Sequence, residues 1–296
     1  MVVSLEPLSQ ALKTTAMVFA GAFLEALKTT AIVFALMVAI EYAEVRWRRR
    51  IRSAFTGRPW RQYLTASLLG LVPGCVTAWL VVGLYVRGIA SFGALVAVML
   101  STAGDEGLIM LARIPKSVPL LFGMLAAVGV LGGGLADWLT KRLNLELCKE
   151  CAVPIHEDPA EQIRGLRHFL SDHVWGHIAR RHLPRLFAWI LGMILLLDLA
   201  GGWLKAEALA PAGSLALLLA AALVGLLPTS GPHLAFVLMF AKHQAPFSVL
   251  LTNSLVQDGH GLLPLLHHTR RDAIYLKGFD FILGLAVGIP LWLLGH

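Results

Sequence analysis

The sequence is short of charge: Asp, Glu, Lys and Arg make up 15% of its 296 residues, whereas a soluble globular domain carries roughly 25%. Hydrophobic residues make up 57%, and the mean hydropathy is +0.72. This composition excludes a soluble protein and indicates a chain embedded in lipid. Because one span needs about 20 apolar residues, the chain has room for roughly eight spans, or ten if some are half-length. A single-anchor enzyme with a folded ectodomain is therefore excluded.

Several motifs are also missing. The sequence contains no G-x-x-x-x-G-K-[ST] phosphate loop, no HExxH zincin motif and no G-x-S-x-G nucleophile elbow. Residues 1 to 10 lack the basic start of a secretory signal, so we expect the first hydrophobic stretch to remain as a span. The net charge of +7 is concentrated in two loops, as expected on the cytoplasmic side of a membrane protein, and nucleic-acid binding is not expected.

Long apolar runs predict an all-helical polytopic membrane protein, because lipid leaves open backbone no other hydrogen-bond partner. The runs are 16 to 44, 63 to 87, 90 to 112, 117 to 139, 184 to 203, 212 to 242, 246 to 267 and 273 to 294. One long polar connector interrupts them. We therefore divide the chain into a first transmembrane repeat at 1–139, a Cys/His-rich connector at 140–183 and a second transmembrane repeat at 184–296.

An internal repeat relates the two halves. Shifting residues 66 to 111 by 155 positions aligns glycine, proline, phenylalanine and basic residues: Gly70 with Gly225, Pro73 with Pro228, Arg87 with Lys242, Phe92 with Phe247 and Gly104 with Gly259. Glycine and proline thus interrupt the apolar runs at equivalent places, and paired breaks of this kind are the best sequence pointer to the central site of a transporter.

The orientation of the repeats depends on the number of membrane elements per half. Four plain spans per half would make the repeats parallel and would place the connector outside. Five elements per half, some of them re-entrant half-helices, would place both the connector and the arginine-rich loop at 46 to 61 in the cytoplasm and invert the repeats. We favour inversion.

Polar residues lie at or near these breaks, within otherwise apolar runs. An ionisable residue in a span costs about 2.5 to 3.5 kcal/mol on insertion scales, so it marks a candidate site. The candidate transport residues are Glu41, Cys75, Ser101, Thr102, Asp105, Glu106, Asp198, Ser230, His233, Asn253, Gln257, Asp258 and His260. Among them, the candidate metal ligands are Asp105, Glu106, His233, Asp258 and His260. Glu41 and Asp198 precede the repeat cores, and Glu41 is equally well explained by a position near the membrane interface.

Carboxylate, imidazole and amide groups suit borderline or hard divalent cations such as Mn²⁺, Fe²⁺, Zn²⁺ or Co²⁺, whereas a soft metal would require more sulfur. The same groups can carry protons. These candidate residues therefore favour the exchange of a metal ion for protons. The structural alternative is that they form buried hydrogen bonds that merely hold helices together.

Four short motifs carry a family resemblance. Pro73-Gly74-Cys75, Gly104-Asp105-Glu106, Pro228-Thr229-Ser230-Gly231-Pro232-His233 and Gln257-Asp258-Gly259-His260-Gly261 resemble a family of ten-span heavy-metal exporters, whose members are often labelled arsenic efflux or manganese transporters. The stretches YVRGIASFGALVA, SGPHLAFVLMFA and NSLVQDGHGLLPLL extend the resemblance over most of residues 60 to 290. It implies a transporter with a metal or metalloid substrate. We expect a multi-pass protein of the bacterial inner membrane. The oligomeric state stays open, with a homodimer as one alternative.

The connector carries a second candidate metal site. Cys148 and Cys151 are followed, after 21 residues, by His173 and His177, close to a Cys2His2 zinc arrangement with a long spacer. Alternative ligands are His156, His168 and His182. The site would hold a structural or regulatory Zn²⁺; the alternative is an amphipathic surface helix beside reduced cytosolic thiols.

We predict a secondary active exporter of a divalent cation such as Mn²⁺ or Fe²⁺, working by proton antiport, rather than an enzyme. The alternatives are an arsenical or metalloid permease, a passive cation channel, and an intramembrane metal-dependent enzyme. Duplicated broken helices argue against the enzyme, because a single catalytic site does not need two of them. Sequence alone does not separate an exporter from a channel.

Overall fold

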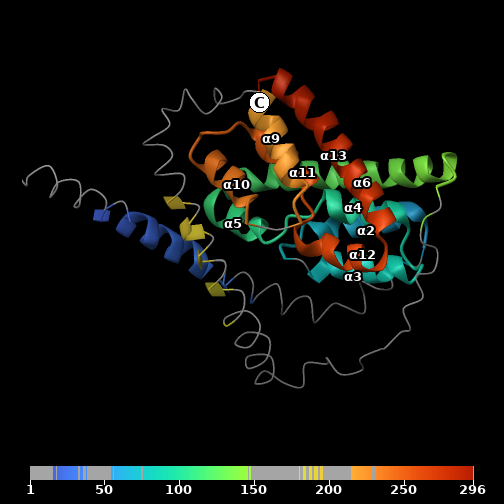
Figure 1. Cartoon of the computed structure of the whole chain (residues 1–296), viewed down its shortest axis with the longest axis horizontal. Helices are drawn as coiled ribbons and strands as arrows, with labels where there is room; N and C mark the ends of the chain where they lie inside the picture. The colour runs from blue at the N-terminus through green and yellow to red at the C-terminus, as the bar shows by residue number, and fades with distance from the viewer. Residues whose placement is uncertain are drawn as a thin grey trace, which may run out of the picture.

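The computed structural model describes residues 57–74, 76–145, 215–228 and 231–295, together with residues 55 and 147 and parts of 16–38 and 180–195. All regular secondary structure in these residues is helical (Figure 1). The described part of the chain therefore has the all-helical structure that the composition predicts.

Residues 57–145 of the first half contain four short helices and one long one. They are α2 (Pro59–Gly70), α3 (Val76–Val86), α4 (Phe92–Leu100), α5 (Glu106–Arg113) and α6 (Val118–Arg142). Two apolar runs each contain two helices, separated at residues 71–75 and 101–105. The first separation includes Pro73, which has no backbone N–H to donate. The backbone turns at Gly74 and Gly104, with φ of 114° and 56°, which only glycine adopts without strain. The long helix α6 ends three residues beyond the expected limit of the first repeat at residue 139.

The second half has the same order of elements. It contains α9 (Leu215–Gly225), α10 (Leu234–Ala241), α11 (Phe247–Val256), the short 3-10 helix η2 (Gly259–Gly261), α12 (Leu262–His268) and α13 (Arg270–Leu293). The breaks again coincide with proline and glycine, at residues 226–233 and 257–261. Gly259 has a φ of 51°, like its counterpart Gly104.

Two of the described helices, α6 and α13, are long and apolar enough to cross a bilayer. Their outer faces carry exposed large hydrophobic side chains, including Leu131 and Leu135 on α6 and Ile274 and Ile282 on α13. Exposed leucine and isoleucine on this scale would be unfavourable in water but suit contact with lipid. Length and surface together are those of membrane-spanning helices.

The helices α4 and α11 form the centre of the molecule (Figure 1). Every residue of α4 is buried, and so is every residue of α11 from Ser248 to Val256. In the first half α2 and α6 pack on α4, and in the second half α9 and α13 pack on α11. The halves also interlock, because α5 packs against α10 and α12 against α3. The centre is thus shared by both halves.

Glycines let the long helices approach the central ones closely. A methyl group at Gly129 or Gly133 of α6 would collide with α4, and one at Gly284 or Gly288 of α13 would collide with α11. The two glycines of each pair are four residues apart, which is the spacing at which small residues bring membrane helices into backbone contact. The second pair lies 155 positions after the first, so the 155-residue repeat found at residues 66 to 111 continues into the long helices.

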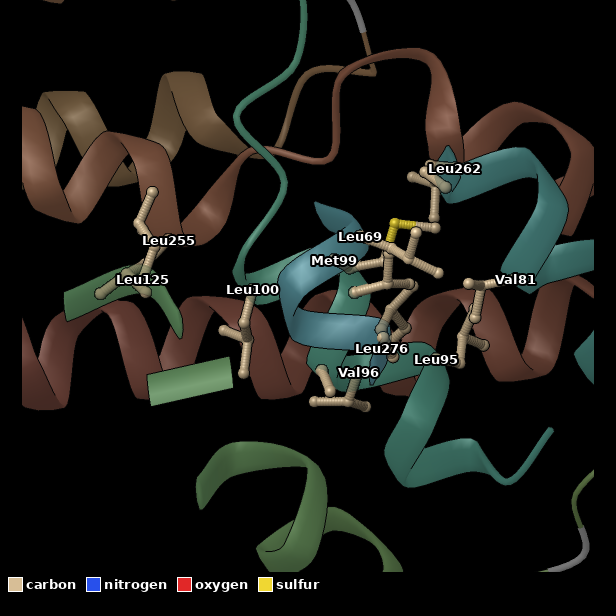
Figure 2. Packing of buried hydrophobic residues seen from close by; sticks show 14 of the residues in the cluster. Leu69, Val81, Leu95, Val96, Met99, Leu100, Leu125, Leu255, Leu262 and Leu276 are labelled. Atoms are coloured by element: carbon tan, nitrogen blue, oxygen red, sulfur yellow. The ribbon is translucent and has the colours of Figure 1, made fainter. Parts of the chain in front are cut away.

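Apolar side chains from seven helices fill the space between the two halves. Figure 2 shows this core, to which α4 contributes Leu95, Val96, Met99 and Leu100. The other labelled side chains are Leu69 of α2, Val81 of α3, Leu125 of α6, Leu255 of α11, Leu262 of α12 and Leu276 of α13. Since half-one and half-two leucines pack together, the halves are held as one body around the central helices.

Buried carboxylates anchor two of the helix ends. Asp137 of α6 accepts hydrogen bonds from the Gly93 backbone N–H and the Tyr63 hydroxyl, both at 2.6 Å. A carboxylate beside the first turn of α4 is favourable because helix N-termini carry unpaired N–H groups and partial positive charge. Asp272, in the first turn of α13, accepts from the Tyr85 hydroxyl at 2.7 Å and so ties α13 to α3.

Candidate functional site

The two breaks of the first half are joined to each other by backbone hydrogen bonds. The Ala103 N–H donates to the Gly70 carbonyl, and the Gly74 N–H donates to the Gly104 carbonyl, both at 3.0 Å. The close approach requires glycine, since a methyl group at Gly70 would overlap Val98 and Ser101. The C-terminal ends of α2 and α4 therefore meet at one point inside the protein.

The second half reaches the same point through Gln257, directly after α11. The Gln257 side-chain amide Nε2 donates to the Thr102 carbonyl at 3.1 Å. The hydroxyls of Ser101 and Thr102 donate to carbonyls within α4, at 2.7 Å to Ala97 and 2.6 Å to Val98. The C-terminal ends of α4 and α11 are thereby linked, and helix C-termini carry partial negative charge. We call this place the central junction, formed by residues 101–106 and 256–258.

Unpartnered oxygens gather around Gly104 in the central junction. Glu106 is 2% exposed and Gln257 is 1% exposed. Among the described residues, neither carboxylate oxygen of Glu106 and not the Oε1 of Gln257 has a hydrogen-bond partner. A methyl group at Gly104 would overlap Glu106 Oε2 and would lie 3.4 Å from Gln257 Oε1. Acceptors buried without donors are costly, so this arrangement suits a bound positive charge.

A buried ion pair lies beside the central junction. Lys277 of α13 contacts Asp258 Oδ2 at 2.8 Å. Its ammonium also donates to the Val256 carbonyl at 2.8 Å and the Gly225 carbonyl at 3.1 Å, which are the last residues of α11 and α9. Asp280, one turn further along α13, is completely buried and lies close to both Asp258 and Lys277. Lys277 thus pairs with Asp258, and a second buried carboxylate lies beside this pair.

His233 connects two segments of the second half through hydrogen bonds of its ring. Its Nε2 lies 3.2 Å from the Leu227 carbonyl, and its Nδ1 lies 3.3 Å from the Asn253 amide nitrogen. Because a carbonyl can only accept, Nε2 is the protonated nitrogen and Nδ1 accepts from Asn253. Asn253 also donates to the Ala221 carbonyl at 2.9 Å. Both ring nitrogens are therefore engaged in joining the break after α9 to α11.

The central junction brings together only part of the expected site. Ser101, Thr102, Glu106, Gln257 and Asp258 lie in it, and Asp105 precedes Glu106 with its side chain partly buried. Among the residues that the structure describes, no three His, Cys, Asp or Glu side chains converge on one metal position. Several expected site residues fall outside the described part, namely Glu41, Cys75, Asp198, Ser230, Cys148, Cys151, His173, His177 and the side chain of His260.

The sequence reasoning did not single out Lys277 and Asp280. Both lie in the apolar run from 273 to 294, so they carry the same signal, a charge within a span, that marked Asp258. The first half has no such charges at the equivalent positions, which are Phe122 and Leu125 at the 155-residue spacing. Lys277 and Asp280 therefore lie outside the features that the two halves share.

Comparison with known proteins identifies a family over nearly the whole chain. The sequence profile of the family described as "Putative, 10TM heavy-metal exporter" matches residues 10–181 and 185–294. No curated protein and no solved structure matches the chain. The profile covers both halves and includes the helices that form the central junction. The chain therefore belongs to this ten-transmembrane family and is a multi-pass membrane protein.

Proposed function

We propose that this protein exports a divalent transition-metal cation such as Mn²⁺ or Fe²⁺ across a bacterial inner membrane in exchange for protons, and that the cation passes through the central junction. The observation that carries the proposal is the group of buried, unpartnered oxygens of Glu106 and Gln257 at Gly104. A metal cation would satisfy these oxygens, and when it leaves, protons on the carboxylates would limit the cost of the empty site.

The helix ends support a cation as the substrate. The helices α2, α4, α9 and α11 all direct C-terminal carbonyls toward the central junction or the adjoining Lys277. Partial negative charge at helix C-termini favours cations, and transporters coordinate cations at such ends of interrupted helices. The donors are carboxylate, amide and carbonyl oxygens, which suit Mn²⁺ or Fe²⁺ better than a soft metal or arsenical.

The contacts of α13 support inverted repeats. Along α11, α13 runs in the opposite direction, because Gly284 lies at Val256 and Gly288 lies at Thr252. Along α4, it runs in the same direction: Phe279 packs on Phe92 at the start of α4, and Leu283 approaches Gly132 beside Leu100 at its end. Because α13 is antiparallel to α11 and parallel to α4, α4 and α11 point in opposite directions, with their C-terminal ends toward each other.

The dimensions agree with two half-helices meeting at the membrane midplane. The helix α4 has 9 residues and α11 has 10. At about 1.5 Å per residue they measure about 14 and 15 Å, so end to end they span nearly the roughly 30 Å of a bilayer core. The central junction would then lie near the midplane, equally far from both surfaces.

Transport by purified protein in sealed vesicles tests the proposal. Vesicles loaded with Mn²⁺, Fe²⁺, Zn²⁺ or arsenite are diluted into metal-free buffer, with a pH gradient imposed or collapsed at constant voltage. We expect efflux of a divalent cation, movement of protons in the opposite direction, and slower efflux when the gradient is collapsed. Efflux that ignores the gradient would favour a channel, and efflux of arsenite alone would replace the proposed substrate.

A further inference from the structure

The lysine beside the central junction has the surroundings of a bound cation. Its side chain is 13% exposed, and its ammonium is held by one carboxylate oxygen and two carbonyl oxygens, at 2.8, 2.8 and 3.1 Å. Both carbonyls belong to the final residues of half-membrane helices, Gly225 and Val256. The ammonium donates hydrogen bonds to the two carbonyls and contacts the carboxylate as an ion pair.

A purely structural role does not account for this lysine. In the first half the equivalent helix-end carbonyl, that of Gly70, accepts from the Ala103 backbone N–H at 3.0 Å. No lysine is needed there: the residue equivalent to Lys277 is Phe122, and the residue equivalent to Asp258 is Ala103. The fold therefore closes the same kind of break without charge in one half. In the other half it introduces a buried acid and a buried base together.

The ion pair is also directly connected to the candidate substrate site. Asp258 follows Gln257 in the chain, and the Gln257 side chain reaches both the Thr102 carbonyl and the space at Gly104. Asp280 adds a second buried carboxylate beside Asp258. A divalent cation drawn to these oxygens would meet the Lys277 ammonium and repel it, because like charges at short distance interact strongly at low dielectric.

We propose that Lys277 acts as a tethered cation. Its ammonium pairs with Asp258 when the carrier is empty, and the transported metal displaces it. The proposal rests on the export function proposed above. Lys277 would neutralise Asp258 while the empty carrier reorients, a step in which an uncompensated carboxylate would be costly. Metal-loaded reorientation does not need this neutralisation, because the metal supplies the charge.

Two modes of transport separate these steps. Exchange of Mn²⁺ outside for labelled Mn²⁺ inside uses only the loaded carrier, whereas net efflux into metal-free buffer also requires the empty carrier to return. We expect Lys277→Gln to lower net efflux at least about tenfold relative to exchange, and Lys277→Arg to keep both modes, since it keeps the charge. Lys141→Gln, at the exposed end of α6, is the matched control and should resemble the wild type.

Equal loss of both modes in Lys277→Gln, or normal net efflux, would overturn the proposal. Lys277→Met, similar in shape and uncharged, carries the same test if Lys277→Gln is not monodisperse on purification. Mn²⁺ binding in detergent gives a second readout: the uncharged variant should bind at least as tightly as the wild type, and weaker binding would also overturn the proposal. Absence of both modes in the wild type with every metal would instead refute the export function itself.

Discussion

A carboxylate buried without a donor is among the least favourable groups in a protein interior, and Glu106 is such a group. It lies at the start of α5, next to Asp105 and over Gly104. Nothing in the packing of α5 requires an acid at this position, because an amide of the same shape would fill the same space. An acid at this position is expected if the residue serves the proposed cation binding at the expense of stability.

The variant Glu106→Gln tests whether the Glu106 carboxylate serves cation binding. The change keeps the shape and removes the charge, so metal efflux should fall at least about tenfold while the thermal unfolding midpoint stays the same or rises. Flux in vesicles and thermal unfolding in detergent measure the two effects.

The matched control for this variant is Glu25→Gln. Glu25 belongs to the helical stretch 19–32 and pairs with Arg113 at the end of α5, outside the central junction. The pair is only partly buried, and ion pairs in contact with solvent contribute about 0–1 kcal/mol, so both measurements should stay close to the wild type. Wild-type efflux by Glu106→Gln would remove Glu106 from the site.

At the scale of helices, the positions of α4 and α11 depend on glycines in α6 and α13. A methyl group at Gly133 would meet the Gly93 carbonyl and the Ala97 side chain, neither of which can rotate away. Gly278 of α13 has open space around its α carbon. Two glycines in helix interiors thus differ only in what lies opposite them.

We expect Gly133→Ala and Gly278→Ala to change stability in opposite directions. Overpacking costs about 1–3 kcal/mol, so Gly133→Ala should unfold at a lower temperature and transport more slowly. Alanine in an open helix position gains up to about 1 kcal/mol over glycine, so Gly278→Ala should unfold at the same or a higher temperature. Thermal unfolding of both variants measures this. Equal midpoints would show that α6 and α4 do not pack as closely as described.

At the scale of the whole molecule, the two halves share a centre, and the side of the membrane on which the connector lies would distinguish inverted from parallel repeats. With five membrane elements per half, the connector and the arginine-rich loop lie on the same, cytoplasmic side. In that topology the connector thiols would stay reduced, and Cys148 and Cys151 would be available as metal ligands. The connector cysteines lie outside the described residues, so this site stays a prediction.

Metal content tests the connector. The purified wild type should carry about one Zn²⁺ more per chain than the Cys148→Ser/Cys151→Ser double variant, since two thiolates and two imidazoles complete a tetrahedral site. The difference should shrink in acid, because protons compete for the ligands. Equal metal content in both proteins would reject the site. Labelling of Cys148 by an impermeant reagent from outside intact cells would reject the cytosolic connector and the inverted topology.

Much of the architecture could be predicted from composition and spacing. Low charge and long apolar runs indicate a polytopic helical protein, and the paired Gly and Pro residues mark where the runs divide into short helices. Glu106, Gln257 and Asp258 could be found because a polar residue in a span stands out against its neighbours. Lys277 and Asp280 stand out equally as charges within a span, but they have no counterparts in the first half, so the repeat does not mark them.

The sequence by itself determined the class of protein, the helical content and the positions of the breaks, because these depend on local properties: hydropathy, the missing N–H of proline and the freedom of glycine. Only the tertiary structure decided how the polar residues are used. It engages both nitrogens of His233 in hydrogen bonds, pairs Asp258 with Lys277 and leaves the oxygens of Glu106 and Gln257 without donors. A side chain's partners depend on segments more than a hundred residues away, as between Gln257 and Thr102, and spacing along the chain does not carry that information.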